Sequence, residues 1–132
     1  MSIIRDISLT ILIFLTLDYI WIDFIMINRY NKVINGIQGS PMNWYTLPSV
    51  IGYACLFYGF YNYVIQKIER KADFISIFSL AIPFAVTVYG FFNFMNATIF
   101  KNYDMMTAII DYFWGITNCC ITASLVAYIR DY

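Results

Sequence analysis

The chain has 132 residues, of which 61% are hydrophobic and 12% are charged, and its formal net charge is zero. Soluble domains contain about 45–50% apolar and about 25% charged residues, so this composition is typical of a protein whose solvent is lipid. The balanced charge and the lack of a basic cluster exclude an electrostatic nucleic-acid interface. The sequence contains no histidine, which excludes histidine-based metal sites and triads, and we expect neither a metal nor a cofactor.

Long apolar segments follow one another along the chain, separated by short polar connections. Each has about 20 or more residues, which at about 1.5 Å per residue is enough to cross a hydrocarbon core of about 30 Å. Because backbone hydrogen bonds in lipid must be satisfied within the segment, each is expected to form a helix. The sequence therefore predicts an all-α, multi-pass integral membrane protein, a single antiparallel four-transmembrane-helix bundle over 1–132. Its spans are roughly 7–27, 45–65, 74–100 and 106–129.

The connections predict how the spans run. The first, over 28–44, is the longest and carries glycine and Ser-Pro turn signals, whereas the short connection near 101–105 makes the last two spans antiparallel neighbours. Pro83 lies within the third span and is expected to kink it. Positive side chains are more numerous on one side, which by the positive-inside rule places both termini in the cytoplasm. The side with more positive charges carries Arg5, Lys67, Arg70, Lys71 and Arg130, and the other side carries Arg29, Lys32 and Lys101.

The tetrapeptide pattern Asp-Tyr-x-Trp occurs twice inside the apolar segments, at 18–21 and at 111–114. A charged side chain at the bilayer centre costs about 2.5–3.5 kcal/mol on insertion scales. No lysine or arginine lies at the same depth to pair with these aspartates. Their partners are therefore expected to be asparagine, tyrosine, threonine, tryptophan N–H groups, backbone, water or a ligand.

Counting from the span centres places several polar residues at matching depths. Asp18 is level with Asn118, and Asp23 is level with Asp111, because the first and last spans are antiparallel. Gly115 would allow close approach of a neighbouring helix. These positions predict a polar pocket that opens on the non-cytoplasmic side, with Asp18, Asn118 and Tyr89 as its floor. The predicted site residues are Asp18, Trp21, Asp23, Tyr53, Tyr89, Asn93, Asn96, Asp111, Trp114 and Asn118.

Each of these residues also has a structural interpretation. Asparagine hydrogen bonds between helices stabilise membrane bundles by about 0.6–2 kcal/mol each, and this role suits Asn93 and Asn96 at least as well as ligand binding. Trp21 and Trp114 are expected to act mainly in packing. Asp23 could equally face the membrane interface.

The same residues resemble a known sequence pattern. Asp18-Tyr-Ile-Trp21, Gly90 with Asn93 and Asn96-Ala-Thr98, and Asp111-Tyr-Phe-Trp114-Gly115 are similar to a small four-span membrane family of bacteria and large DNA viruses. This family is catalogued as a domain of unknown function, number twenty-one seventy-seven. The resemblance covers nearly the whole chain and implies that these positions are a shared feature of the family. It implies no activity, because the family has none assigned.

Three classes of function remain open. The first is a carrier, channel subunit or sensor that binds a small molecule or protons in the pocket. It would work as a homo-oligomer, since four spans are few for a complete transporter. The second is a structural or assembly protein of a membrane, for example a viral one, in which the polar residues fix helix packing. The third and least favoured is an intramembrane enzyme with an aspartate dyad, because the expected depths separate Asp18 from Asp111.

Overall fold

The structure is a computed structural model that describes residues 2–132, and these residues form helices joined by turns and short connections, without a strand. The elements are α1 (Ile3–Ile20), the π-helical segment η1 (Trp21–Ile25), α2 (Ile27–Gln38), α3 (Thr46–Tyr63), the 3₁₀ turn η2 (Ile65–Lys67), α4 (Phe74–Ala85), the π-helical segment η3 (Val86–Gly90), α5 (Phe91–Ile99) and α6 (Met105–Asp131). The predicted all-α class is confirmed.

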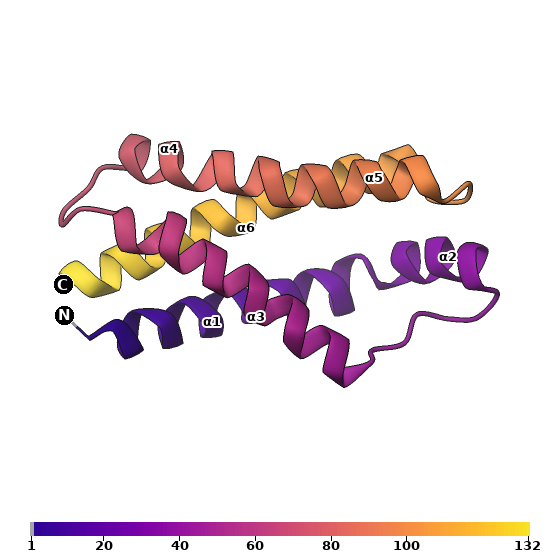
Figure 1. Ribbon diagram of the computed structural model, residues 1–132, viewed down its shortest axis with the longest axis horizontal. Helices are drawn as coiled ribbons and strands as arrows, with labels where there is room; N and C mark the ends of the chain where they lie inside the picture. Colours follow the sequence, from indigo (N-terminus) through magenta and orange to yellow (C-terminus); the bar gives the residue numbers. More distant parts are fainter. Residues whose placement is uncertain (1) are drawn as a thin grey trace.

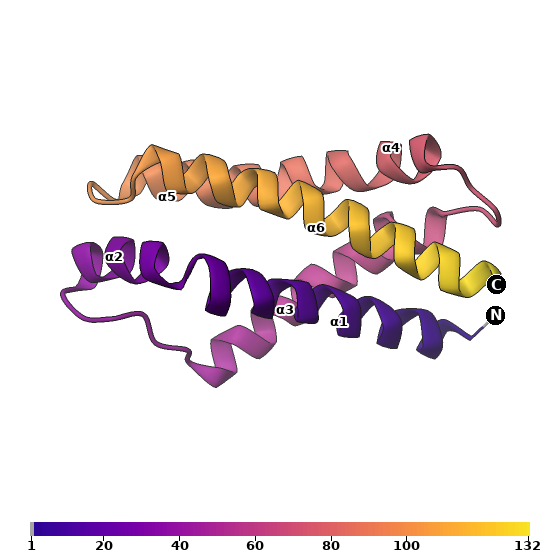
Figure 2. The same cartoon turned by 180° about the vertical axis from the view of Figure 1, so that it is seen from behind.

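The helices form an elongated bundle of roughly antiparallel rods (Figure 1). α1 continues through η1 into α2, and α4 continues through η3 into α5, while α3 crosses the bundle obliquely. Both termini lie at the end where α3 leads into α4, and the other end carries α2 and the α5–α6 turn (Figures 1 and 2). α6 is the central helix, because it contacts α1, α4 and α5.

Side-chain caps explain where three of the helices begin. The first backbone N–H groups of a helix lack partners within the helix, and a Ser or Asp side chain before it can accept from one of them. Ser2 accepts from the N–H of Arg5 at the start of α1, and Asp73 accepts from Ser76 N at 2.9 Å at the start of α4. At the start of α6, Asp104 accepts from the backbone N and Oγ1 of Thr107 at 2.8 and 2.6 Å. These bonds lower the pKa of Asp104.

Three helical rods are long and apolar enough to cross a membrane, namely Ile3–Ile25, Phe74–Ile99 and Met105–Asp131. They agree with the first, third and fourth predicted spans. α3 matches the second predicted span in position but is not one of the three in residues 2–132. Large apolar side chains cover the outside of the bundle, and Ile4 and Ile75 are 78% and 80% exposed. Such a surface is suited to contact with lipid.

The predicted first connection contains a helix that the turn signals concealed. α2 occupies most of 28–44 and ends at Gly39, whose φ of +74° is the left-handed conformation that commonly terminates helices. Gly36 does not interrupt α2. Its carbonyl accepts from Asn102 Nδ2 at 2.7 Å, which ties α2 to the α5–α6 turn.

A π-helical segment follows Pro83, the residue at which the sequence predicts a kink. α4 continues through Pro83, and three residues later η3 begins at Val86. The kink itself stays a prediction. Thr87 Oγ1 donates to the carbonyl of Pro83 at 2.8 Å. π-helical segments are typical of positions where the regular hydrogen-bond ladder of a helix is disturbed. The segment carries Tyr89, one of the predicted site residues, and Gly90, which belongs to the sequence pattern described above.

The apolar core occupies the half of the bundle that holds the termini. Small side chains on α4 and α6 let these helices approach closely, which favours van der Waals packing. The core residues include Phe14, Phe60, Val64, Ile77, Ala81, Ala85, Cys119, Ala123 and Val126. The buried polar side chains of the middle of the bundle lie beyond this core.

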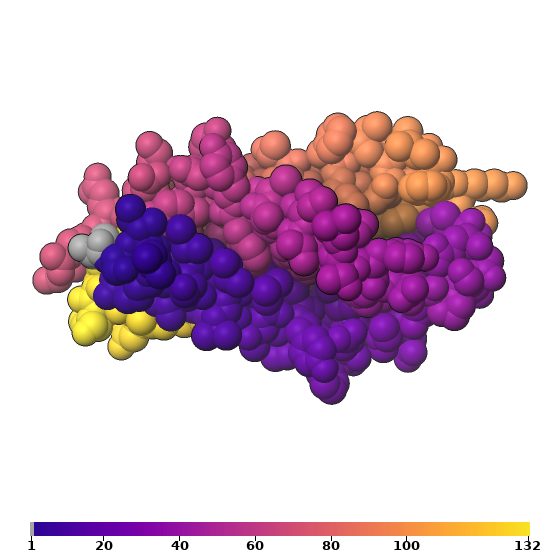
Figure 3. All heavy atoms as spheres, turned by 60° about the horizontal axis from the view of Figure 1, so that its bottom comes forward, coloured from indigo at the N-terminus to yellow at the C-terminus, as the bar shows by residue number. Residues whose placement is uncertain are grey.

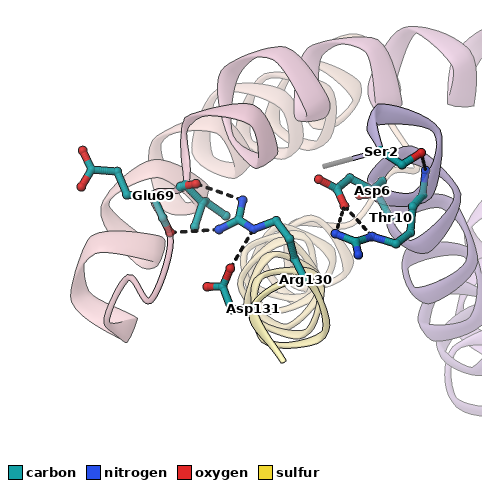
Figure 4. Close-up of polar contacts among 8 residues, drawn as sticks. Ser2, Asp6, Thr10, Glu69, Arg130 and Asp131 are labelled. Carbon is teal, nitrogen blue, oxygen red and sulfur yellow. Dashed lines mark hydrogen bonds and ion pairs between the residues drawn. The ribbon is translucent and has the colours of Figure 1, made fainter.

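Arg130 closes the terminal end of the bundle (Figure 4). Its buried guanidinium donates to the carbonyls of Ile68 and Glu69 at 3.0 and 2.9 Å and pairs with Asp131 at 3.2 Å. Asp131 Oδ2 accepts from Lys71 N at 2.7 Å. The end of α6 therefore holds the connection between α3 and α4.

Arg130→Met is expected to lower the free energy of unfolding by about 1–3 kcal/mol, since two carbonyls lose their donor. Thermal unfolding in a mild detergent would measure this loss. Arg70→Met is the matched control, because Arg70 is exposed on the same connection. Equal effects of the two substitutions would contradict the role assigned to Arg130.

Candidate functional site

The two Asp-Tyr-x-Trp segments meet in the middle of the bundle. The indole rings of Trp21 and Trp114 stack with centroids 4.5 Å apart and planes 4° from parallel. Trp114 Nε1 donates to Asp18 Oδ1 at 2.9 Å. Trp21 Nε1 donates to Tyr30 Oη at 3.0 Å, and Tyr30 Oη donates to Asp111 Oδ1. Each tryptophan thus supports the aspartate of the other segment, one directly and the other through Tyr30.

Asp18 is held by groups from two other helices. Besides Trp114, Asn118 Nδ2 donates to Asp18 Oδ1 at 3.1 Å, and Tyr53 Oη donates to Oδ2 at 2.9 Å. Thr122 Oγ1 donates to Asn118 Oδ1 at 3.0 Å, which orients the amide so that its NH₂ group faces Asp18. Asp18 and Asn118, which the sequence places at the same depth, are thus hydrogen-bonded. Every donor to this buried carboxylate is neutral.

Asp111 is held in the same way. Asn93 Nδ2 donates to Asp111 Oδ2 at 2.7 Å, and Tyr103 Oη donates to Asn93 Oδ1 at 2.9 Å. Burial and the nearby Asp111 raise the pKa of Tyr103 to about 12, and burial also raises the pKa of Tyr30. Both hydroxyls therefore keep their protons and act as donors. Like Asp18, Asp111 is satisfied by neutral groups.

The hydrogen-bonded side chains around Asp18 and Asp111 form one polar cluster, and a cavity of about 660 Å³ lies beside this cluster. Both aspartates form part of its wall, between α1, α2, α3, α5 and α6, and Figure 3 shows the surface hollowed between the orange and the purple segments. Most of the remaining wall is apolar or aromatic, and of residues 2–132 no lysine or arginine lines it. The apolar and aromatic members include Ile22, Val33, Ile34, Ile37, Met42, Trp44, Leu56, Val88, Phe92 and Phe100.

Gly115 permits a close contact at the base of the cluster. A Cβ atom added there would lie 2.1 Å from Cγ of Tyr89, which is far inside van der Waals contact. The tyrosine ring therefore lies directly on the α6 backbone, and this is the close approach that the sequence predicts for Gly115. Tyr89 also lines the cavity.

Eight of the ten predicted site residues form or border the cluster, and Asn96 lines the cavity without joining its hydrogen bonds to the aspartates. Asp23 lies apart, because it is exposed and is not in the cavity wall. Five residues are more than one turn of a helix and fewer than two, so Asp23, in η1, does not lie on the face of the rod that carries Asp18. The eight are Asp18, Trp21, Tyr53, Tyr89, Asn93, Asp111, Trp114 and Asn118.

Three contributors to the cluster are absent from the predicted set: Tyr30, Tyr103 and Thr122. Tyr30 lies in the segment that the sequence presents as a connection. The spacing of Tyr30, Val33, Ile34 and Ile37 is i, i+3, i+4, i+7, which is typical of one helical face, and all four line the cavity. That periodicity is the signal that identifies α2.

The chain matches a described family of membrane proteins. A family described as a predicted membrane protein, DUF2177, matches residues 3–129. The chain belongs to this DUF2177 family. No curated protein and no solved structure matches it. The matched range of the DUF2177 family includes both Asp-Tyr-x-Trp segments, Gly115 and every helix that lines the cavity.

The arrangement limits the chemistry of the site. Among residues 2–132, no three aspartate, glutamate or cysteine side chains gather closely enough to hold a metal ion. Asp111 is bonded to Tyr30 and Asn93 rather than to a second carboxylate. The carboxyl oxygens of Asp18 and Asp111 can accept hydrogen bonds from a molecule in the cavity, or lie against a positively charged group of that molecule.

Proposed function

We propose that this DUF2177 member is a four-span integral membrane protein whose cavity binds a small molecule, with Asp18 and Asp111 as its polar anchors. α3 would be the remaining span, since its 18 residues extend about 27 Å at 1.5 Å per residue. The position of both termini at one end fits an even number of crossings (Figure 1). The charge distribution favours the cytoplasm for that end.

One observation carries the binding proposal: two carboxylates border a cavity of about 660 Å³ whose wall is otherwise mainly apolar. Helical bundles normally fill their interior to a density that leaves few voids larger than a water molecule. Ligand pockets measure about 300–1,000 Å³ and combine apolar walls with a few polar groups. A bundle that needed only rigidity could replace each aspartate and its hydrogen-bonding partners together by apolar side chains, and would then avoid the cost of placing two carboxyl groups in the membrane.

A structural or assembly role is the second candidate. It is favoured by the hydrogen bonds themselves, because Asp18 and Asp111 each already have at least two protein donors. Such a network can fix the packing of helices without any ligand. Under either function we expect the chain to form homo-oligomers in the bilayer. The two differ in whether filling the cavity has a consequence.

Intrinsic fluorescence tests the binding proposal directly, because the three tryptophans of the chain all line the cavity. N-phenyl-1-naphthylamine, a neutral apolar fluorophore, is expected to quench them when titrated into protein in non-ionic detergent. Gly52→Phe would place a ring at the cavity wall, where an added Cβ meets no atom within 4 Å. This substitution is expected to raise the dissociation constant measured by quenching about tenfold, which corresponds to about 1.4 kcal/mol of binding free energy.

Ile51→Phe is the control, because Ile51 is an exposed neighbour on α3 and does not line the cavity. It corrects for probe that partitions into detergent near the protein. Equal quenching in wild type, Gly52→Phe and Ile51→Phe would remove the binding proposal. An altered oligomeric state in Gly52→Phe with unchanged quenching would favour the structural role.

A further inference from the structure

We propose that the ligand is a lipophilic cation, such as a hydrophobic quaternary ammonium, amine or phosphonium ion. This inference rests on the proposed binding function and adds the chemical class of the ligand. It combines the charge of the cavity wall, the position of the nearest basic residues and the character of the remaining side chains.

The charge of the wall is one-sided. Asp18 and Asp111 both border the cavity, and of residues 2–132 no lysine or arginine does. The hydrogen-bond donors to these two carboxylates are tyrosine, tryptophan and asparagine groups, none of which carries a positive charge. The protein therefore supplies hydrogen bonds to the carboxylates and leaves the opposite charge to the occupant.

The basic side chains at this end of the molecule, Arg29, Lys32 and Lys101, do not line the cavity. Arg29 and Lys32 line a second recess together with Asn102 and Asp104. Arg29 Nη1 lies 3.8 Å from Asp104 Oδ1, so its charge is paired with Asp104, which does not line the cavity. Arg29 Nη1 also lies 3.4 Å from the hydroxyl of Thr107, which is a wall residue, so Arg29 approaches the edge of the cavity without lining it. An anion in the cavity would meet two carboxylates without a compensating cation.

Both carboxylates retain room for a further interaction. A carboxylate has about four lone-pair positions, and Asp111 accepts from Tyr30 and Asn93 only. Asp18 accepts from Trp114, Asn118 and Tyr53. An ammonium head could donate to the free positions, and a quaternary head could lie against the carboxylates without donating.

The rest of the wall suits the apolar body and the charge of such an ion. Nine aromatic side chains line the cavity, and the electron-rich faces of Trp and Tyr attract cations. The nine are Trp21, Tyr30, Trp44, Tyr53, Tyr89, Phe92, Phe100, Tyr103 and Trp114. A hydrated inorganic cation would be poorly matched, since Mg²⁺ and Ca²⁺ require about six or more oxygen ligands.

Two ions of the same shape and opposite charge provide the test. Tetraphenylphosphonium and tetraphenylborate would each be titrated into the full-length protein in non-ionic detergent, with tryptophan quenching and calorimetry as readouts. We expect the phosphonium ion to bind at least about 50-fold more tightly than the borate ion. Asp18→Asn with Asp111→Asn is expected to abolish this preference.

Asp23→Asn is the matched control, because it removes the same charge from an exposed position outside the cavity. It should leave the preference for the phosphonium ion unchanged. If the double variant does not fold, the comparison of the two ions on the wild-type protein and on Asp23→Asn still decides the matter. Equal affinity for both ions, or tighter binding of the borate ion, would overturn the inference.

The neutral fluorophore separates this inference from the function on which it rests. Quenching by N-phenyl-1-naphthylamine that is sensitive to Gly52→Phe, without a preference for the phosphonium ion, would refute the cation and leave the binding function standing. If Gly52→Phe changes the quenching by none of the three probes, both the cation inference and the proposed binding function would be refuted.

Discussion

Gly115→Ala is expected to be strongly destabilising, because the new methyl group has no space. The added Cβ would lie 2.1, 2.3 and 2.4 Å from three carbons of the Tyr89 ring. Overpacking of a well-packed interior generally costs about 1–3 kcal/mol of stability and sometimes more. These contacts are so short that the cost of Gly115→Ala is expected at the upper end of this range or beyond. Thermal unfolding in detergent, with the monodisperse fraction on size-exclusion chromatography, would measure the loss.

Two variants make the Gly115 prediction specific. Gly52→Ala is the control, since nothing lies within 4 Å of its added Cβ, and it should change stability little. Tyr89→Ala removes the ring, so Gly115→Ala should be far less harmful in that background. A double-mutant cycle would reveal this coupling. Additive effects would contradict the direct contact between Gly115 and Tyr89.

Asp18→Ala is the second substitution expected to have a large effect. It removes the acceptor from Trp114, Asn118 and Tyr53 at once. A buried polar group left without a partner costs about 1–3 kcal/mol, so a loss of several kcal/mol is expected. Asp18→Asn should fall between wild type and Asp18→Ala, because the amide keeps one acceptor oxygen.

Asp23→Ala is the comparison for Asp18→Ala, because it is an aspartate in the same rod with an exposed side chain. Its unfolding temperature should remain close to that of wild type. Tryptophan emission provides a second readout, since the indole of Trp114 would lose its acceptor in Asp18→Ala only. Similar losses in Asp18→Ala and Asp23→Ala would show that the hydrogen bonds of Asp18 contribute little.

Composition and segment length were sufficient to predict the long apolar helices but not α2. Rods at Ile3–Ile25, Phe74–Ile99 and Met105–Asp131 lie close to predicted spans, because an apolar segment in lipid has few alternatives to a helix. α3, at the position of the predicted second span, is less apolar than these rods, and its crossing of the membrane stays a prediction. α2 was missed because its asparagines and lysine lower its hydrophobicity and only its helical spacing indicates it.

Depth counting predicted part of the site, because it gives heights on antiparallel helices but not contacts. It placed Asp18 level with Asn118, and these two side chains are hydrogen-bonded. It also placed Asp23 level with Asp111, but Asp111 is bonded to Tyr30 and Asn93, and Asp23 is exposed outside the cavity wall. Depth does not specify rotation about the helix axis, and the π-helical segment η1 begins at Trp21. Contacts between side chains, such as the stacking of Trp21 on Trp114, depend on tertiary packing that residue spacing does not encode.

The neighbouring chain ends have a practical consequence for studying assemblies. Because the start of α1 and the end of α6 lie at the same end of the bundle (Figures 1 and 2), a flexible linker can join the end of α6 in one copy to the start of α1 in the next. Such a tandem fusion would keep all copies in the same orientation. One copy could then carry a substitution while its neighbour stays intact, so the number of functional units in an assembly becomes countable.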